Sequence, residues 1–180
     1  MNTIELLVDH DRNRQLLAEW LGEIYDVRTA TPSESDESPF GDADLCLVDP
    51  EAFAANQSAL RTWKDEMDPV FAPVLLVSEA DLTEEFDPAD WETIDGLYVV
   101  DDIVTMPVEK AVLHRRLENL LERRRLSGQL AQRYEQAERR FRSLFNGTPD
   151  PALVLEEGLV SQANDAFCRV CGLDREDLVG

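Results

Sequence analysis

Residues 108–145 read VEKAVLHRRLENLLERRRLSGQLAQRYEQAERRFRSLF, and this run divides the chain into two dissimilar parts. Its leucines and aromatic residues recur at spacings of three and four, which predicts a helix. Before the run, an acidic sequence alternates short apolar stretches with helix-like segments. After it, a short remainder begins what resembles a separate unit. We therefore expect a long helix that joins two modules and carries a change of state between them.

The composition is strongly acidic. The 180 residues include 38 Asp and Glu against 17 Lys and Arg, a formal charge of -21, and the lysines are Lys64 and Lys110. Acidity with arginine in place of lysine resembles the cytoplasmic proteins of salt-loving archaea, in which salt screens repulsion between like charges. We therefore expect a halophilic, cytoplasmic protein whose fold is weaker in ordinary salt.

The charge is unevenly distributed along the chain. Residues 1–108 hold 26 acids and 5 bases, a net of -21, whereas residues 109–142 hold 5 acids and 10 bases, a net of +5. The first module thus lacks the basic face that nucleic-acid phosphates require. The arginine-rich helix leaves a DNA-binding regulator as an alternative. However, its glutamates at helical spacing from arginines favour a solvated face and predict no nucleic-acid partner: Glu118, Glu122, Glu135 and Glu138.

The sequence gives little support for a membrane protein, a disulfide-rich protein or a zinc-binding protein. The sequence has no amino-terminal basic-then-apolar signal segment and no apolar run near 18 residues, so we expect no membrane partner. Three cysteines, Cys46, Cys168 and Cys171, form no disulfide framework. Cys168 and Cys171 are spaced as C-x-x-C, but no further ligands complete a zinc site, which favours packing roles on a helix.

The first module predicts a doubly wound α/β domain. Five short apolar runs have the length of buried strands, at residues 3–8, 25–30, 44–48, 73–77 and within 97–105. Helical spacing marks residues 11–22 and 51–66 between them, residues 31–42 are expected to form a loop, and a short helix is expected near Trp91. Strands separated by helices indicate a five-stranded parallel sheet with right-handed crossovers.

Chemistry-bearing side chains follow these expected strands. Asp9, Asp49, Ser78 and Thr105 stand at or just after the strand ends, and the carboxyl ends of parallel strands form the usual functional edge of such sheets. Two acids and a hydroxyl could hold a divalent cation and accept a phosphoryl group, because hard cations prefer carboxylate oxygens. Mg is the only cofactor that the sequence indicates.

Four segments resemble the successive blocks of a response-regulator receiver domain over residues 1–124. They are LLVDHDRNRQLL, DLCLVDPEAF, APVLLVSEAD and DDIVTMPVEKAVLHRRLENLL. The resemblance implies that Asp49 is the phospho-accepting aspartate, Asp9 a metal-binding acid and Ser78 the switch hydroxyl. It also implies a cis bond before Pro107 and a histidine kinase or phosphotransfer protein as partner.

The sequence departs from the receiver pattern at several positions. His10 stands where receivers have a second acid, and Met106 where they have a lysine; the glycine-rich turn after Asp49 is absent. Asp11 could supply the missing metal carboxylate, although it also fits a helix cap. Three interpretations follow: a receiver-like domain that no longer takes phosphate, which we favour, one phosphorylated at Asp49, and an unrelated doubly wound domain. No kinase catalytic domain is expected, so enzymatic activity would be limited to self-phosphorylation.

The long helix has two expected roles. Its first half has a wide apolar face typical of a last receiver helix packed on the sheet. Residues 125–145 lack a predicted sheet to pack on, and we expect them to form a signalling helix that pairs with a second copy in a parallel coiled coil. Ser127 and Gly128 leave a hinge open as an alternative. The predicted stripes are Leu113, Leu117, Leu120, Ala131, Tyr134, Phe141 and Phe145, beside Leu121, Leu126, Leu130 and Ala137.

Residues 138–180 resemble the start of a PAS sensory domain. The matching features are ERRFRSLF, a Thr-Pro-Asp turn, PALVLEE, ANDAFCRVCGL and DREDLVG. They cover about a third of such a domain, so we expect a parent protein that continues past Gly180. The organisation resembles the amino-terminal regions of haloarchaeal sensor histidine kinases and multidomain regulators. It predicts a two-component regulatory module with a receiver-like domain (1–124), a signalling helix (125–145) and a PAS fragment (146–180).

Overall fold

The computed structural model describes residues 1–29, 40–79 and 99–178. It divides into two compact units, residues Met1–Gln129 and Leu130–Gly180. The short helix predicted near Trp91 lies outside the described residues, as does most of the loop predicted at 31–42.

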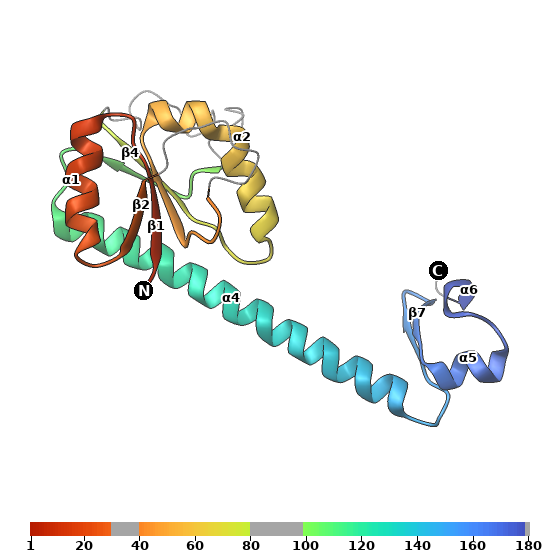
Figure 1. The fold of residues 1–180 in the computed structure, drawn as a ribbon. Coiled ribbons are helices and arrows are strands. Elements are labelled where there is room, and N and C mark those ends of the chain that lie inside the picture. Colours follow the sequence, from red (N-terminus) through yellow and green to blue (C-terminus); the bar gives the residue numbers. More distant parts are fainter. Residues whose placement is uncertain (30–39, 80–98, 179–180) are drawn as a thin grey trace. The chain divides into compact units, whose positions relative to one another are not determined.

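The first unit is built on a five-stranded parallel sheet (Figure 1). Its strands are β1 (Thr3–Leu7), β2 (Asp26–Thr29), β3 (Leu45–Val48), β4 (Val74–Ser78) and β5 (Asp102–Thr105). They run in the order β2-β1-β3-β4-β5, and all four pairings are parallel. The predicted doubly wound sheet is thereby confirmed.

Helices cover both faces of this sheet. α1 (Asp11–Gly22) and the first turns of α4 (Lys110–Gly147) lie on one face, and α2 (Pro50–Met67) lies on the other (Figure 1). Successive side chains of β1 point to opposite faces of the sheet. Ile4 and Leu6 therefore join the core under α1 and α4, while Leu7 joins the core under α2. The leucines of α4 that the sequence assigned to the sheet are buried: Leu113, Leu117, Leu120 and Leu121.

The three cysteines are free thiols in different surroundings. Cys46 lies in β3 with no exposed surface, and burial raises the pKa of its thiol well above the ordinary value. It is therefore a core residue that stays protonated. Cys168 is half-buried and Cys171 is exposed, so both thiols are more accessible to solvent than that of Cys46.

Polar contacts hold α4 against the sheet as far as Ser127. The Ser127 hydroxyl accepts a 2.8 Å hydrogen bond from the Phe71 amide and donates to the Arg124 carbonyl. Arg124 pairs with Asp44 at 3.0 Å and also donates to the Phe71 carbonyl. The structure is helical through Ser127 and Gly128. Ser127 thus fixes the helix to the loop before β4, at the place where the sequence left a hinge open.

Beyond Ser127, α4 carries a line of exposed apolar side chains. Tyr134 is 74% exposed and Leu144 is 76% exposed. Together with Leu130, Ala137 and Phe141 they are separated by four, three, four and three residues. This spacing is that of one coiled-coil seam. The observed line differs from the two stripes predicted from sequence, since it takes Leu130 and Ala137 from one, and Tyr134 and Phe141 from the other.

The second unit contains a hairpin and two short helices. β6 (Leu153–Glu156) pairs antiparallel with β7 (Leu159–Ala163), followed by α5 (Asp165–Cys171) and α6 (Arg175–Leu178). Glu157 and Gly158 both have positive φ, at 52° and 89°, as a two-residue hairpin turn requires. The expected strand and helix of the PAS-like segment are present.

Asn164 lies at the centre of this unit with no exposed surface. Its side-chain carbonyl accepts hydrogen bonds from the Ala152 amide at 3.0 Å and the Phe167 amide at 2.8 Å. Its amide group donates to the carbonyls of Phe145 and Asp150. One side chain therefore caps α5 and ties it to the end of α4 and to the start of the hairpin.

Candidate functional site

The ends of the central strands bring together two of the predicted site residues. Asp49, directly after β3, lines a pocket of about 470 Å³ together with Ser78 at the end of β4. His10 and Met106 line the same pocket. Asp9 is joined to the site through its backbone, because its amide donates to Asp49 Oδ2 at 2.7 Å. Parallel strand ends meet at one edge, which is why residues far apart in sequence lie together here.

Asp49 also caps a helix. Its backbone is extended, with φ -95° and ψ 169°, and its Oδ1 accepts a 2.8 Å hydrogen bond from the Ala52 amide at the start of α2. Oδ2 meanwhile accepts from the Asp9 amide and, at 3.5 Å, from the His10 amide. Both carboxylate oxygens are therefore engaged by main-chain donors. This role of Asp49 was not predicted from the sequence, although an aspartate followed by Pro50 is a recognised helix-start signal.

Of the other two predicted metal ligands, Asp9 is an exposed residue and Asp11 is engaged in an ion pair. The Asp11 carboxylate is 90% exposed and pairs with Arg14, which also donates to the Val8 carbonyl. His10, and not Asp11, caps α1, since its Nδ1 accepts from the Asn13 amide at 3.4 Å. Within residues 1–29, 40–79 and 99–178, no three acidic, histidine or cysteine side chains are grouped to hold a metal. A hard cation such as Mg prefers carboxylate oxygens, and at Asp49 and Asp11 it would compete with these existing partners.

The remaining receiver-like positions lie beside Ser78. Ser78 is 2% exposed, and its carbonyl accepts a 2.7 Å hydrogen bond from the Met106 amide. Thr105 is opposite Ser78 in the register of β4 and β5. The Met106–Pro107 bond is cis, as the receiver resemblance implies. A methionine thioether at this position places no positive charge beside Asp49 and Ser78.

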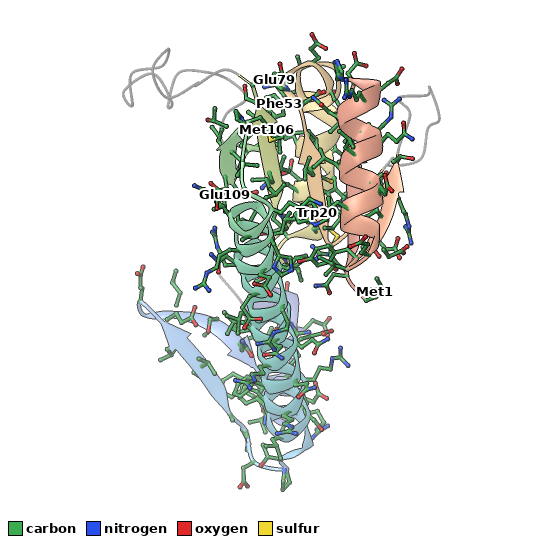
Figure 2. The ribbon with its side chains drawn as sticks, turned by 90° about the vertical axis from the view of Figure 1, so that its left-hand side faces the viewer. Met1, Trp20, Phe53, Glu79, Met106 and Glu109 are labelled. Carbon is green, nitrogen blue, oxygen red and sulfur yellow. The ribbon has the colours of Figure 1, made fainter. Side chains whose placement is uncertain are left out.

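The pocket extends from the strand ends along α1 to the start of α4. Leu16, Leu17 and Trp20 line it from α1, and Lys110 and Leu113 from α4. Figure 2 labels three of the lining residues, with Glu79 at the top, Met106 below it and Trp20 lower still. The Lys110 ammonium lies 5.4 Å from the centre of the Trp20 ring. The site is therefore a largely apolar pocket that is also lined by charged groups, which are Asp49, Glu51, Glu79 and Lys110.

Two solved structures with a similar arrangement of strands and helices are described as response regulators. The TrrA response regulator of Thermotoga maritima, crystallised with Mg2+-BeF, has a TM-score of 0.50 at 19% identity, covering 67% of this chain and 99% of its own. A two-component response regulator of Clostridium difficile has a TM-score of 0.51 at 14% identity, covering 68% and 98%. The first unit has the fold of a receiver domain.

A longer match comes from NtrX of Brucella abortus, solved with ADP. It has a TM-score of 0.55 at 20% identity and covers 87% of this chain, which spans 32% of the NtrX chain. The family model described as the PAS fold matches residues 139–180, which confirms the predicted resemblance at this end. No match was found among curated proteins. The receiver-like domain and the PAS-like segment are thus two separate modules of one chain.

Proposed function

We propose that this chain is a regulatory module of two-component signal transduction, in which a receiver-like domain without phosphoryl acceptance acts through α4 on a PAS-like segment. The receiver fold and the PAS match support the class of function. The proposed divisions are a receiver-like domain at 1–124, a signalling helix at 125–145 and a PAS fragment at 146–180. Its proposed setting is the cytoplasm of a halophilic cell, on the basis of its acidic, lysine-poor composition.

One observation carries the non-phosphorylated assignment: the Asp49 carboxylate caps the first turn of α2. An acyl phosphate forms on one of the two carboxylate oxygens, and that oxygen would lose its present hydrogen bond, from the Ala52 amide at Oδ1 or from the Asp9 amide at Oδ2. It would also lack the lysine that receivers present at the position of Met106. Acylation at Oδ1 would remove the cap of α2 at a cost of about 0.5–2 kcal/mol, and acylation at Oδ2 would remove the acceptor of the Asp9 amide.

Beryllofluoride and Mg in high salt test this proposal. We expect no change in the fluorescence of Trp20 and Trp63, and no amide shifts near Asp49, because the carboxylate is engaged by main-chain donors. A receiver such as TrrA, described in complex with Mg2+-BeF, serves as the positive control. Saturable shifts at Asp49 and Ser78 would instead support the alternative, a receiver phosphorylated at Asp49 by a histidine kinase or phosphotransfer partner.

The proposed coupling element is α4, which begins in the first unit and ends in the second. In the first unit it is fixed by buried leucines, by Arg116 with Asp102 at 2.5 Å, and by the contacts of Arg124 and Ser127. In the second unit, the carbonyl of Phe145 in this helix accepts a hydrogen bond from the Asn164 side chain. A change in either unit therefore acts directly on this helix.

We further propose that the exposed line of Leu130, Tyr134, Ala137, Phe141 and Leu144 pairs with the same line of a second copy. Aromatic and leucine side chains with this exposure and spacing are typical of a parallel two-stranded seam. Ion pairs within α4 occupy several of its arginines, as with Arg139 and Glu135 and with Arg142 and Glu138. This pairing supports a protein partner for the helix over DNA.

Substituting two positions of this line tests the dimer. The double variant Leu130→Arg and Leu144→Arg is expected to be monomeric in sedimentation equilibrium in high salt, whereas the unchanged chain is expected to be dimeric, since like charges would meet across the seam. Gln136→Arg adds a charge off the line and is expected to remain dimeric. A monomeric unchanged chain at concentrations of tens of micromolar would contradict the proposal.

A further inference from the structure

The pocket at the strand ends has the size of a small-molecule site. Its volume is about 470 Å³, and small-molecule sites usually occupy roughly 300–1,000 Å³ with apolar walls and a few polar groups. The assignment of Asp49 as a helix cap leaves the pocket without a function. We propose that it binds a small amphiphilic organic cation, a compact aromatic or aliphatic body that carries an ammonium group.

The walls of the pocket fit an apolar body. Leu17 is 8% exposed, Val77 is 7% exposed and Leu113 is 2% exposed, so these three lining residues belong to the core and form a fixed surface. Leu16 is 57% exposed and completes the wall from α1. A ligand that covers Leu16 and Trp20 would remove apolar surface from water, which favours binding by about 25 cal/mol per Å².

The charged groups favour a positive ligand. Asp49, Glu51 and Glu79 line the pocket against one lysine, Lys110, with His10 as the remaining titratable group. Asn13 holds Glu79 through a 3.3 Å hydrogen bond, and the Asp49 oxygens accept main-chain donors. Residues 1–108 carry a net charge of -21 from 26 acids and 5 bases, and such an excess of acids favours association with cations.

Trp20 provides a second feature that suits a cation. The Lys110 ammonium lies 5.4 Å from the centre of its indole ring, which is a cation–π contact. Lys110 is the exposed partner in this contact. A ligand ammonium could take the same place while Lys110 moves to solvent. Lys110 and Leu113 belong to the first turns of α4, so an occupied pocket would contact the helix that the proposed signalling depends on. Binding itself requires neither phosphorylation nor dimerisation.

Three probes of one shape and different charge test the proposal. Phenethylamine, 2-phenylethanol and phenylacetate would be titrated into the full chain at the lowest salt that keeps its circular dichroism unchanged. Trp20 fluorescence and the amide shifts of Leu17, Val77 and Leu113 would be followed. We expect phenethylamine to bind most tightly, then the alcohol, then phenylacetate.

Matched variants locate the site. Leu16→Arg is expected to weaken phenethylamine binding about 10-fold or more, because a like charge stands at the apolar wall. Val112→Arg places the same charge on α4 outside the pocket, at a residue that is 44% exposed, and is expected to change binding less than about 2-fold. Glu51→Gln with Glu79→Gln should weaken phenethylamine, and not the alcohol, about 2- to 5-fold.

Three results would overturn the proposal. The first is the absence of saturable binding by all three probes, and the second is tighter binding of phenylacetate than of phenethylamine. The third is equal affinity of the Leu16→Arg and Val112→Arg variants for phenethylamine. Circular dichroism of each variant excludes misfolding, and the isosteric glutamine variants test the charge preference without altering the apolar wall.

Discussion

Replacing Asn164 with alanine is expected to remove the ordered structure of residues 150–171 while the first unit stays folded. The substitution deletes four side-chain hydrogen bonds, to Ala152, Phe167, Phe145 and Asp150. Each is worth about 0.5–1.5 kcal/mol net, and a lost helix cap alone costs about 0.5–2 kcal/mol. The expected loss is roughly 2–4 kcal/mol, which is large for an isolated two-stranded hairpin.

Amide hydrogen exchange measures this loss residue by residue. The Ala152 and Phe167 amides should lose protection in Asn164→Ala, whereas Leu47 and Leu76 in the sheet of the first unit should keep theirs. Asn164→Asp is a sharper variant, because a carboxylate keeps the acceptor and cannot donate to the Phe145 and Asp150 carbonyls. Gln162→Ala, an exposed position of β7, is the control. Unchanged protection in both Asn164 variants would show that this network is not what orders the segment.

Replacing Asp49 with alanine is expected to destabilise the first unit by about 2 kcal/mol, because the Ala52 and Asp9 amides lose their acceptor. Asp49→Asn keeps one carbonyl oxygen, so its expected loss is about half of that. Urea unfolding in high salt, followed by Trp63, which is 1% exposed, gives the free energy of unfolding. The sign of the change separates the two roles of Asp49: the capping role predicts that Asp49→Ala lowers the free energy of unfolding, whereas a role as phosphoryl acceptor predicts that it raises it.

If Asp49 instead served to bind Mg and accept a phosphoryl group, its carboxylate would be repelled by the other acids and would have no hydrogen-bond donors to offset this repulsion. Removing it would relieve like-charge repulsion and raise stability. Asp65→Ala removes an exposed acid from the same helix and corrects for the general benefit of lowering the charge of so acidic a chain. If Asp49→Ala were more stable than Asp65→Ala, the capping role would be wrong, and the phosphorylatable receiver would be the better assignment.

Regular patterns in the sequence were sufficient to predict the five strands and helix α1 of the first unit. The apolar runs with branched residues predicted the five strands, and helical spacing through Leu17 and Leu21 predicted α1 with the bounds Asp11–Gly22 that the structure has. Both signals are local, since burial on two faces selects strands of continuous apolar residues. The two resemblances were likewise carried by short segments, and the receiver fold and PAS match agree with them.

The site depended on contacts that no local pattern contains. Asp49 was predicted from its place after a strand, but its engagement by the Asp9 amide joins residues 40 apart. Ser127 was a weak point of a helix in the sequence and became a hydrogen-bonded anchor only because Phe71 lies beside it. The pocket required α1, α4 and the strand ends together.

The sequence by itself predicted most of the helices and strands, the parallel character of the sheet and the change from a receiver-like to a PAS-like segment, because periodicity and turn chemistry act over a few residues. Only the tertiary structure decided what the polar side chains do. A carboxylate, a hydroxyl or an amide can cap, bind or react, and which of these it does depends on the donors that the fold brings to it. For Asp49, Ser127 and Asn164, those donors come from distant segments of the chain.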